Sequence, residues 1–269
     1  MSQALAWEGN LLGLDFKSRL ARGELVLGLN TPLCRTPEIA PILRAGGYHW
    51  MMIDDEHHPM PTGAAYEIAL SALRSGVLPL VRPRTNSPHE IGACLTNGAL
   101  GVCVPHVEDA AQARTASRAC YYPPRGALSV PGVISQFGYD RFTLDEAAAT
   151  FNREVVCVVM IESRQAVANV EAIAAVEGVH GLLIGGSDLC FEMGLPGGYG
   201  EPAMADAVRR ICNAAYSNGK FVGMGGVKSR DDWQKYIEMG VRMILTENDA
   251  ALLIARMKQR TQEFLTLGL

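Results

Sequence analysis

Short, nearly continuous apolar stretches recur along the chain, separated by segments whose apolar residues have helical spacing. Strands that are apolar at every position, rather than at every second one, are typical of a parallel sheet covered on both faces. The pattern predicts eight parallel strands, at residues 25–30, 48–54, 77–82, 100–105, 155–161, 180–185, 220–225 and 241–246.

Strands and helices alternate throughout the chain. Eight strand–helix units predict a (β/α)8 (TIM) barrel of the α/β class, with a doubly wound sheet as the weaker alternative. Glycine follows several of the helices just before the next strand, as is common at helix C-termini. The predicted helices are 36–45, 63–75, 88–97, 108–119, 164–176, 203–218, 229–239 and 249–265.

The barrel is expected to form a single domain over residues 1–269, because barrels of this kind use about 250 residues. One long interruption, at about 120–154, is rich in Ser, Gly and Pro after a Tyr-Pro-Pro run. A segment of this length on the C-terminal face of a barrel usually helps to form or cover the site. The last helix, about 249–265, has apolar residues at helical spacing, as docking to another subunit would require.

Charged residues follow four of the predicted strands. The strand at 48–54 leads into Asp-Asp-Glu-His-His, the strand at 77–82 ends in Arg82, Glu162 follows the strand at 155–161, and Asp188 lies in the loop after 180–185. The C-terminal ends of barrel strands are where active-site residues lie. The pattern therefore predicts an active site at this end of the barrel.

Glu162 and Asp188 follow neighbouring strands, so the two carboxylates are expected to lie close together and to need a cation between them. Oxygen ligands with water and a chelating substrate suit Mg²⁺, Mn²⁺ or Co²⁺. The spacing is equally consistent with a structural role, in which each carboxylate forms an ion pair with a nearby Arg or Lys instead of binding a metal.

Two histidines and an arginine are further candidates. His57 and His58 leave the strand in opposite directions, so at most one faces the site as a general base, and the spacing does not choose between them. Arg82 offers a planar fork for a carboxylate or an enolate oxygen, or half of an ion pair. The Gly-Gly-Ser-Asp turn at 185–188 has backbone N–H groups that could hold a carboxylate. His106 is expected to be at most an accessory residue.

Composition narrows the class of protein. The net charge of −4 argues against a nucleic-acid surface. The seven cysteines are scattered without C-x-x-C spacing, which is typical of reduced thiols in the cytosol. Residues 1–7 lack the features of a signal peptide, and no apolar stretch reaches the roughly 18 to 20 residues of a membrane span. We expect a soluble, cytoplasmic protein with no membrane or nucleic-acid partner.

The chain resembles the HpcH/HpaI aldolases, which are class II, divalent-metal-dependent pyruvate aldolases. The resemblance runs from Gly28 to about Leu253 and rests on several ordered motifs. These are WMMIDDEHHP at 50–59, PLVRP at 79–83, YPP at 122–124, MIESRQA at 160–166 and GVHGLLIG at 178–185 leading to SDL at 187–189.

The resemblance implies a (β/α)8 barrel in a homo-oligomer, commonly a hexamer of dimers that exchange their last helix. It implies a divalent metal held by Glu162 and Asp188 that chelates pyruvate or a related 2-oxoacid. Arg82 would bind the keto or enolate oxygen, and the N–H groups of Ser187 and Asp188 would hold the carboxylate. His57, selected over His58, would act with a metal-bound water to move the proton. The second substrate would be an aldehyde.

Four positions depart from the family pattern. The usual aspartate on the third helix is Thr96 or its neighbour Asn97, so the carboxylate that would partner His57 is missing. The usual glutamine before the Ile-Glu pair is Met160. The usual proline in the turn after the sixth strand is Gly186. Leu128 stands where an arginine is usual, and Arg125, three residues earlier, is a candidate to compensate for it.

Three functions follow in order of preference. The first is a metal-dependent lyase that makes or cleaves a C–C bond beside a 2-oxoacid. The second is a decarboxylase, synthase or hydrolase that uses the same metal and enolate site with an altered proton relay, as Thr96 and Met160 would favour. The third is a barrel that binds a small acid without catalysis. The retained charged groups at four strand ends argue against it, namely Glu162, Asp188, Arg82 and His57.

Overall fold

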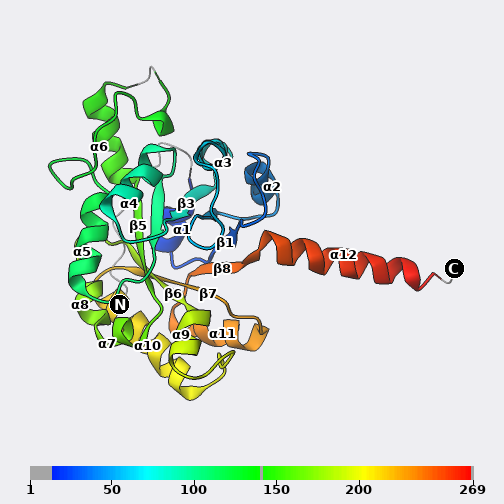
Figure 1. Ribbon diagram of the computed structural model, residues 1–269. Helices are drawn as coiled ribbons and strands as arrows, with labels where there is room; N and C mark the ends of the chain where they lie inside the picture. Colours follow the sequence, from blue (N-terminus) through cyan, green and yellow to red (C-terminus); the bar gives the residue numbers. More distant parts are fainter. Residues whose placement is uncertain (1–13, 140–141, 268–269) are drawn as a thin grey trace.

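The strands of the computed structural model, which describes residues 14–139 and 142–267, form one closed parallel barrel in which each strand pairs with its neighbours in chain order (Figure 1). The expected (β/α)8 fold is confirmed. The strands are β1 (Val26–Asn30), β2 (Trp50–Asp54), β3 (Leu78–Arg82), β4 (Gly101–Val104), β5 (Val156–Ile161), β6 (Gly181–Gly185), β7 (Phe221–Gly225) and β8 (Met243–Asn248).

Helices surround the barrel and alternate with its strands (Figure 1). They are α1 (Phe16–Ala21), α2 (Ile39–Ala45), α3 (Thr62–Arg74), α4 (Pro88–Thr96), α5 (Ala110–Ala119), α6 (Leu144–Glu154), α7 (Arg164–Ala168), α8 (Val170–Ala174), α9 (Gly186–Glu192), α10 (Pro202–Ser217), α11 (Arg230–Met239) and α12 (Asp249–Leu265), with the 3-10 turn η1 (Ser135–Phe137).

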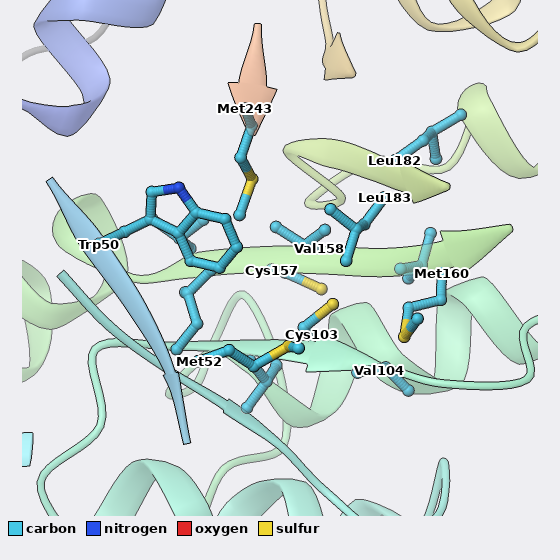
Figure 2. Close-up of a cluster of buried hydrophobic side chains, with 14 of the residues drawn as sticks. Trp50, Met52, Cys103, Val104, Cys157, Val158, Met160, Leu182, Leu183 and Met243 are labelled. Atoms are coloured by element: carbon cyan, nitrogen blue, oxygen red, sulfur yellow. The ribbon is translucent and has the colours of Figure 1, made fainter. Parts of the chain in front are cut away.

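Glycines make room for aromatic rings on the adjacent strand. Gly28 of β1 is in register with Trp50 of β2, and Gly181 of β6 is in register with Phe221 of β7. A Cβ atom on either glycine would overlap the neighbouring ring. Large and small residues therefore interlock from strand to strand, as in the filled interior of a barrel. Figure 2 shows part of the buried cluster, with Trp50, Met52, Cys103, Val104, Cys157, Val158, Met160, Leu182, Leu183 and Met243.

Helix α1 packs at the N-terminal end of the strands. Phe16 is 1% exposed, and its ring meets that of Phe221, the first residue of β7, edge to face at 5.8 Å between centroids. The sequence pattern did not predict this helix because it is short and has few apolar positions to define a period. The opposite, C-terminal end of the barrel is where the charged residues gather.

Three other segments differ from the predicted pattern. The helix predicted at 164–176 is divided at Asn169, whose side-chain amide donates to the carbonyl of Glu108. The long segment 120–154 contains η1 and α6, and α6 begins with a capping box between Thr143 and Glu146. Strand β8 extends to Asn248 because Glu247 and Asn248 pair with β1 after a register shift.

The last helix, α12, extends away from the barrel (Figure 1). Its first residue anchors it, because the buried carboxylate of Asp249 accepts the N–H groups of Leu33 and Cys34 at 2.8–3.1 Å. Beyond this anchor, the helix carries exposed apolar side chains, namely Leu252, Leu253, Ile254, Met257, Phe264 and Leu265. An exposed apolar helix of this kind is a candidate contact surface.

No helix within the described residues is long and apolar enough to cross a membrane. The prediction about residues 1–7 falls outside the described residues. All seven cysteines are described and none is in a disulfide.

Replacement of Gly28 by alanine should destabilise the fold, because the added methyl would overlap the Trp50 ring inside a close-packed barrel. We expect a loss of about 1–3 kcal/mol or more in the free energy of unfolding, measured by urea denaturation. Gly63→Ala is the matched control. Its Cβ would meet no atom within 4 Å, so this helical position should gain about 0.4–1 kcal/mol. Equal stabilities for the two variants would contradict the packing argument.

Candidate active site

The C-terminal ends of β2, β3 and β5 bring a connected set of charged side chains together. Asp54 ends β2 and is in register with Arg82, the last residue of β3. Glu162 follows β5 directly. Glu56 and His106, which lie just beyond β2 and β4, connect these residues into one chain of contacts.

Asp54 and Arg82 form a bidentate ion pair inside the protein. Arg82 Nε donates to Asp54 Oδ1 at 2.9 Å and Arg82 Nη2 donates to Oδ2 at 2.7 Å, and the two residues are 1% and 7% exposed. Burial alone would raise the pKa of Asp54, but the hydrogen bonds and charge of Arg82 hold that pKa well below its usual value. Burial would likewise lower the pKa of Arg82, and Asp54 and Glu56 instead raise it. Both groups are therefore charged at neutral pH.

Glu56 extends this network on the other side of the guanidinium. Its carboxylate lies 3.0 Å from Arg82 Nη1 and 2.8 Å from His106 Nε2, and its side chain is only 9% exposed. Two of the five N–H groups of Arg82 are hydrogen-bonded to Asp54, so the Nη1 edge remains turned toward Glu56 and the rim of the barrel.

His106 connects Glu56 to Glu162. Its Nδ1 atom lies 3.1 Å from Glu162 Oε1, and its backbone N–H donates to the same oxygen at 2.6 Å. His106 has a positive φ of 54°, an uncommon conformation for a residue with a side chain. The double contact with Glu162 holds the residue in this conformation. His106, which the sequence predicts to be at most an accessory residue, thus lies between two carboxylates of the site.

A cavity of about 410 Å³ opens beside Glu162 and contains Asp188 in the same wall. The two carboxylates predicted from neighbouring strands therefore share one cavity. Burial raises the pKa of Glu162, which the N–H group and charge of His106 only partly offset, and the charges of Glu56 and Asp188 raise it further. A carboxylate under this repulsion gains most from a bound cation.

The donor set of this cavity fits a hard divalent cation. Glu162 and Asp188 supply only oxygen atoms, as Mg²⁺ and Mn²⁺ prefer, with water or substrate completing the shell. Within the described parts of the chain, no group of three or more His, Cys, Asp or Glu side chains is arranged to hold a metal. The assignment of Glu162 and Asp188 as metal ligands stays a prediction from the sequence.

The two adjacent histidines have different surroundings. The Nδ1 atom of His58 lies 3.1 Å from Asp54 Oδ2, while the ring of His57 lies 3.7 Å from Glu56 Oε2. Both rings are about half exposed, and the backbone N–H of His57 donates to Asp54 Oδ1 at 3.3 Å. Each imidazole therefore faces a different carboxylate of the network.

Ser187 and Asp188 lie in the first turn of α9, where backbone N–H groups have no partner within the helix. Gly226, in a left-handed conformation with φ of 93°, lies across from them. A Cβ at Gly226 would lie 2.9 Å from Ser187 Oγ and 3.2 Å from Ser187 N, so glycine leaves the space beside this N–H open. The Ser187 hydroxyl lies 3.1 Å from the Tyr199 hydroxyl.

The model of the HpcH/HpaI aldolase/citrate lyase family matches residues 32–254. The chain belongs to this family. A 4-hydroxy-4-methyl-2-oxoglutarate aldolase of Chaetomium globosum is 32% identical over 244 residues, covering 88% of this chain and 89% of the relative. A 5-keto-4-deoxy-D-glucarate aldolase of Escherichia coli is 31% identical over 239 residues, covering 88% of this chain and 91% of the relative. The HpcH/HpaI aldolase structure from Desulfitobacterium hafniense superposes with a TM-score of 0.85 at 26% identity, covering 92% and 95%.

These similarities confirm the expected family and enzyme class, since the relatives are aldolases, that is, carbon–carbon lyases. The departures from the HpcH/HpaI pattern lie in different parts of the structure, and two of them share one groove. Thr96 donates its hydroxyl to the carbonyl of Gly92 at 2.9 Å, within its own helix. Leu128 is buried and lines the same groove as Thr96, a hollow of about 830 Å³ beside α4 and α5. Thr96 and Leu128, which stand where an acidic and a basic residue are usual in the family, therefore lie on one surface.

Arg125 lies away from the cavity wall. Its guanidinium lies 3.9 Å from the centre of the Tyr121 ring, and it donates to the carbonyl of Asn152. Met160 is buried. Its methyl group and the Glu162 carboxylate both lie beside Gly185, close to where a Cβ atom on that residue would stand. Met160 thus supplies an apolar neighbour to Glu162, where the family's glutamine would supply a polar one.

Sequence reasoning gave no role to Asp54 or Glu56, although both lie in the motif that carried the family resemblance. One feature of the sequence could have indicated this role. An acidic residue, Asp54, ends one apolar strand, and an arginine, Arg82, ends the next apolar strand. Paired strand ends of opposite charge indicate a buried ion pair across the ladder, since neighbouring parallel strands end at the same level.

Replacement of Arg82 by methionine should destabilise the protein by about 3–5 kcal/mol at neutral pH, because the Asp54 carboxylate would stay buried without its partner. The folded-state pKa of Asp54 lies below its unfolded value, so the pair stabilises the wild type above about pH 4. That contribution is lost as the pH falls through the lower, folded value. The stability gap between wild type and variant should therefore narrow in acid.

Urea denaturation at several pH values measures this gap. Arg209→Met is the matched control, because Arg209 pairs with Asp206 on the surface and its loss should cost less than about 1 kcal/mol. A similar small loss for Arg82→Met, or a gap independent of pH, would show that Asp54 does not depend on this arginine.

Proposed function

We propose that the protein is a divalent-metal-dependent aldolase that forms or cleaves the C–C bond beside pyruvate or a related 2-oxoacid. The observation that carries the proposal is the shared cavity of Glu162 and Asp188, joined through His106 and Glu56 to the buried Arg82–Asp54 pair. The family membership and the aldolase relatives support the same reaction class.

Glu162 and Asp188 would hold the metal, with Mg²⁺, Mn²⁺ and Co²⁺ as the candidate ions. When bound, such an ion supplies positive charge that polarises the keto oxygen and stabilises the enolate. Ser187 and Asp188 would bind the substrate carboxylate through their backbone N–H groups at the start of α9. The open space beside the Ser187 N–H supports this position.

Arg82 would stabilise the negative charge that develops on the keto oxygen in carbanion formation. Its charge is secured by Asp54, and its plane is fixed by the two hydrogen bonds to that carboxylate. A donor held in place before the reaction needs no reorganisation in the transition state, and removing such a donor typically costs about 3–4 kcal/mol of barrier.

His57 would accept the proton released from the methyl group of the 2-oxoacid, or return it in the cleavage direction. Its ring is exposed at the rim and lies near Glu56, which supports access to substrate. Glu56 would orient this ring in place of the family's aspartate, whose position is taken by Thr96.

A decarboxylase, synthase or hydrolase on a 2-oxoacid is the second candidate. Thr96 bonds to its own helix and Met160 places an apolar group near Glu162, so the groups expected to assist proton transfer differ from the family pattern, while the charged residues at the strand ends do not. The retained network at Arg82 and Glu162 disfavours a non-catalytic acid-binding barrel.

We propose further that the protein is a homo-oligomer whose subunits exchange α12, within a hexamer built from dimers. The exposed apolar side chains along this helix support a contact with another copy. The seven cysteines without disulfides support a reducing compartment such as the cytoplasm.

The proposed reaction predicts exchange of the methyl protons of pyruvate with deuterated water. With Mg²⁺, proton NMR should show loss of the methyl signal, and EDTA should stop it. Glu162→Gln and Asp188→Asn should lower both the exchange rate and the affinity for Mn²⁺ by at least about tenfold, the affinity being measured by calorimetry. Loss of exchange without weaker Mn²⁺ binding would contradict the assigned ligands.

Two matched variants complete this experiment. Asp206→Asn removes an exposed carboxylate on α10 and should leave exchange and Mn²⁺ binding unchanged. His57→Ala should abolish exchange while pyruvate still binds, whereas His58→Ala should retain exchange. Metal-dependent pyruvate binding by the wild type without exchange would favour the second candidate, and absence of both would contradict the proposed substrate.

The exchange of α12 predicts an oligomer whose mass depends on the apolar face of that helix. Met257→Glu places a charge among the exposed apolar residues and should lower the molar mass measured by light scattering at micromolar protein. Gln259→Glu introduces the same charge at a polar position of the same helix and should leave the mass unchanged. A monomeric wild type would rule out the exchanged assembly.

A further inference from the structure

The wall of the cavity that holds Glu162 and Asp188 also includes residues to which the proposed reaction gives no role. These residues are Val107, Glu108, Ser163, Phe191 and Glu192. In an aldol reaction the 2-oxoacid lies at the metal ligands, and the aldehyde must reach its C3 carbon from an adjoining part of the same cavity. This remaining part of the wall is therefore where the second substrate, the aldehyde, would lie.

Phe191 presents an apolar surface on this wall. It lies three residues after Asp188 on α9, so the two side chains are neighbours on the same side of the helix. Its side chain is 70% exposed, although it borders a cavity. Single exposed apolar residues are common, but a large ring beside candidate catalytic carboxylates can pack against a ligand. An apolar group on the aldehyde would cover this ring.

The charges of the wall are negative. Glu108 and Glu192 join Glu162 and Asp188, and the basic side chain among the cavity's lining residues is His106, which lies between Glu56 and Glu162. A divalent cation would neutralise two of the four carboxylates, leaving the charges of Glu108 and Glu192 beside the bound carboxylate of the 2-oxoacid. Among the described residues that line the cavity, none is a lysine or an arginine that could receive another anion.

Glu108 is held at this place by its surroundings. Its carboxylate accepts the hydroxyl of Ser163 at 3.0 Å, its N–H donates to Gln112, and its carbonyl accepts the side chain of Asn169. Such a fixed carboxylate cannot readily turn away from an incoming anion. A carboxylate on the aldehyde would thus meet like charge without a compensating donor.

We propose that the aldehyde substrate is uncharged and carries an apolar group, aromatic or aliphatic, that packs against Phe191. This inference rests on the proposed aldolase function and names the class of its second substrate. In the addition direction, C3 of pyruvate loses a proton and bonds to the aldehyde carbon. The carbonyl π pair moves to the aldehyde oxygen, which takes up a proton, so no oxidant or reductant is needed. The product is a 4-hydroxy-2-oxoacid with an apolar substituent at C4.

Two matched pairs of aldehydes test the charge of the second substrate. Benzaldehyde is compared with 4-carboxybenzaldehyde, and butanal with succinic semialdehyde, each with pyruvate and Mg²⁺. We expect kcat/KM to be at least about tenfold higher for the uncharged member of each pair, a difference of about 1.4 kcal/mol. Glu108→Gln and Glu192→Gln should each narrow this ratio. Equal or faster use of the carboxylated aldehydes would overturn the proposal.

The role of Phe191 is tested by a second ratio. Phe191→Ala should lower kcat/KM for benzaldehyde about tenfold more than for acetaldehyde, which is too small to cover the ring. Asp206→Asn should leave this ratio unchanged. If Phe191→Ala lowers kcat/KM equally for both aldehydes, the ring serves the fold, and the proposal is overturned. If the variant changes the molar mass of the protein while the ratio of the two kcat/KM values is unaltered, the ring serves the assembly, and the proposal is likewise overturned.

Pyruvate exchange without aldehyde separates this inference from the function on which it rests. If the wild type exchanges the methyl protons but prefers the carboxylated aldehydes, only the aldehyde class is wrong. If it neither exchanges pyruvate protons nor adds any aldehyde, the aldolase function fails, and the inference fails with it.

Discussion

The buried carboxylate of Asp54 is the constraint on which the charged end of this barrel depends. A carboxylate that is 1% exposed is stable in its ionised form only if a cation and several donors surround it. The guanidinium of Arg82 meets this need because the last residues of β2 and β3 lie side by side in the parallel ladder. The same guanidinium then reaches Glu56, and through Glu56 and His106 the contacts continue to Glu162. One ion pair thus orders side chains at the ends of four strands.

This network has two consequences for chemistry. Arg82 is fixed and charged before any substrate arrives, which suits a group that stabilises a developing oxyanion. Glu162, at the far end of the network, is less well compensated, since burial and the charges of Glu56 and Asp188 raise its pKa. The barrel therefore provides a satisfied ion pair at one end of the site and a carboxylate that needs a cation at the other.

The departures from the HpcH/HpaI pattern are not scattered at random over the structure. Thr96 and Leu128, which replace an acidic and a basic residue of the family, line one groove, and none of its lining residues is shared with the cavity of Glu162 and Asp188. Both of these departures therefore lie on one surface. Met160 changes the site from a different side, by placing a methyl group near Glu162. The charged residues at the strand ends are unchanged.

The sequence by itself determined the fold and the positions of the candidate ligands. Buried parallel strands are apolar at every position, so Glu162 and Arg82 are conspicuous at strand ends, and adjacency of strands follows from chain order in a barrel. The metal, base and carboxylate roles of Glu162, Asp188, His57 and Ser187 remain proposals. Helices α1 and α9 escaped prediction because they are short, and α6 lies in the long segment 120–154, which was expected only to help form or cover the site.

Only the tertiary structure decided which charges meet. The contacts of His106 with Glu56 and Glu162 depend on side-chain directions at the ends of strands that are distant in sequence. The contact of the His58 ring, rather than the His57 ring, with Asp54 depends on the direction that the chain takes after β2. The wall of Glu108, Phe191 and Glu192 likewise exists only because the segments after β4 and β6 fold over one cavity. Hydrophobic periodicity specifies which residues are buried, but the pairing of polar groups is fixed by three-dimensional distance and local dielectric, which no pattern along the chain records.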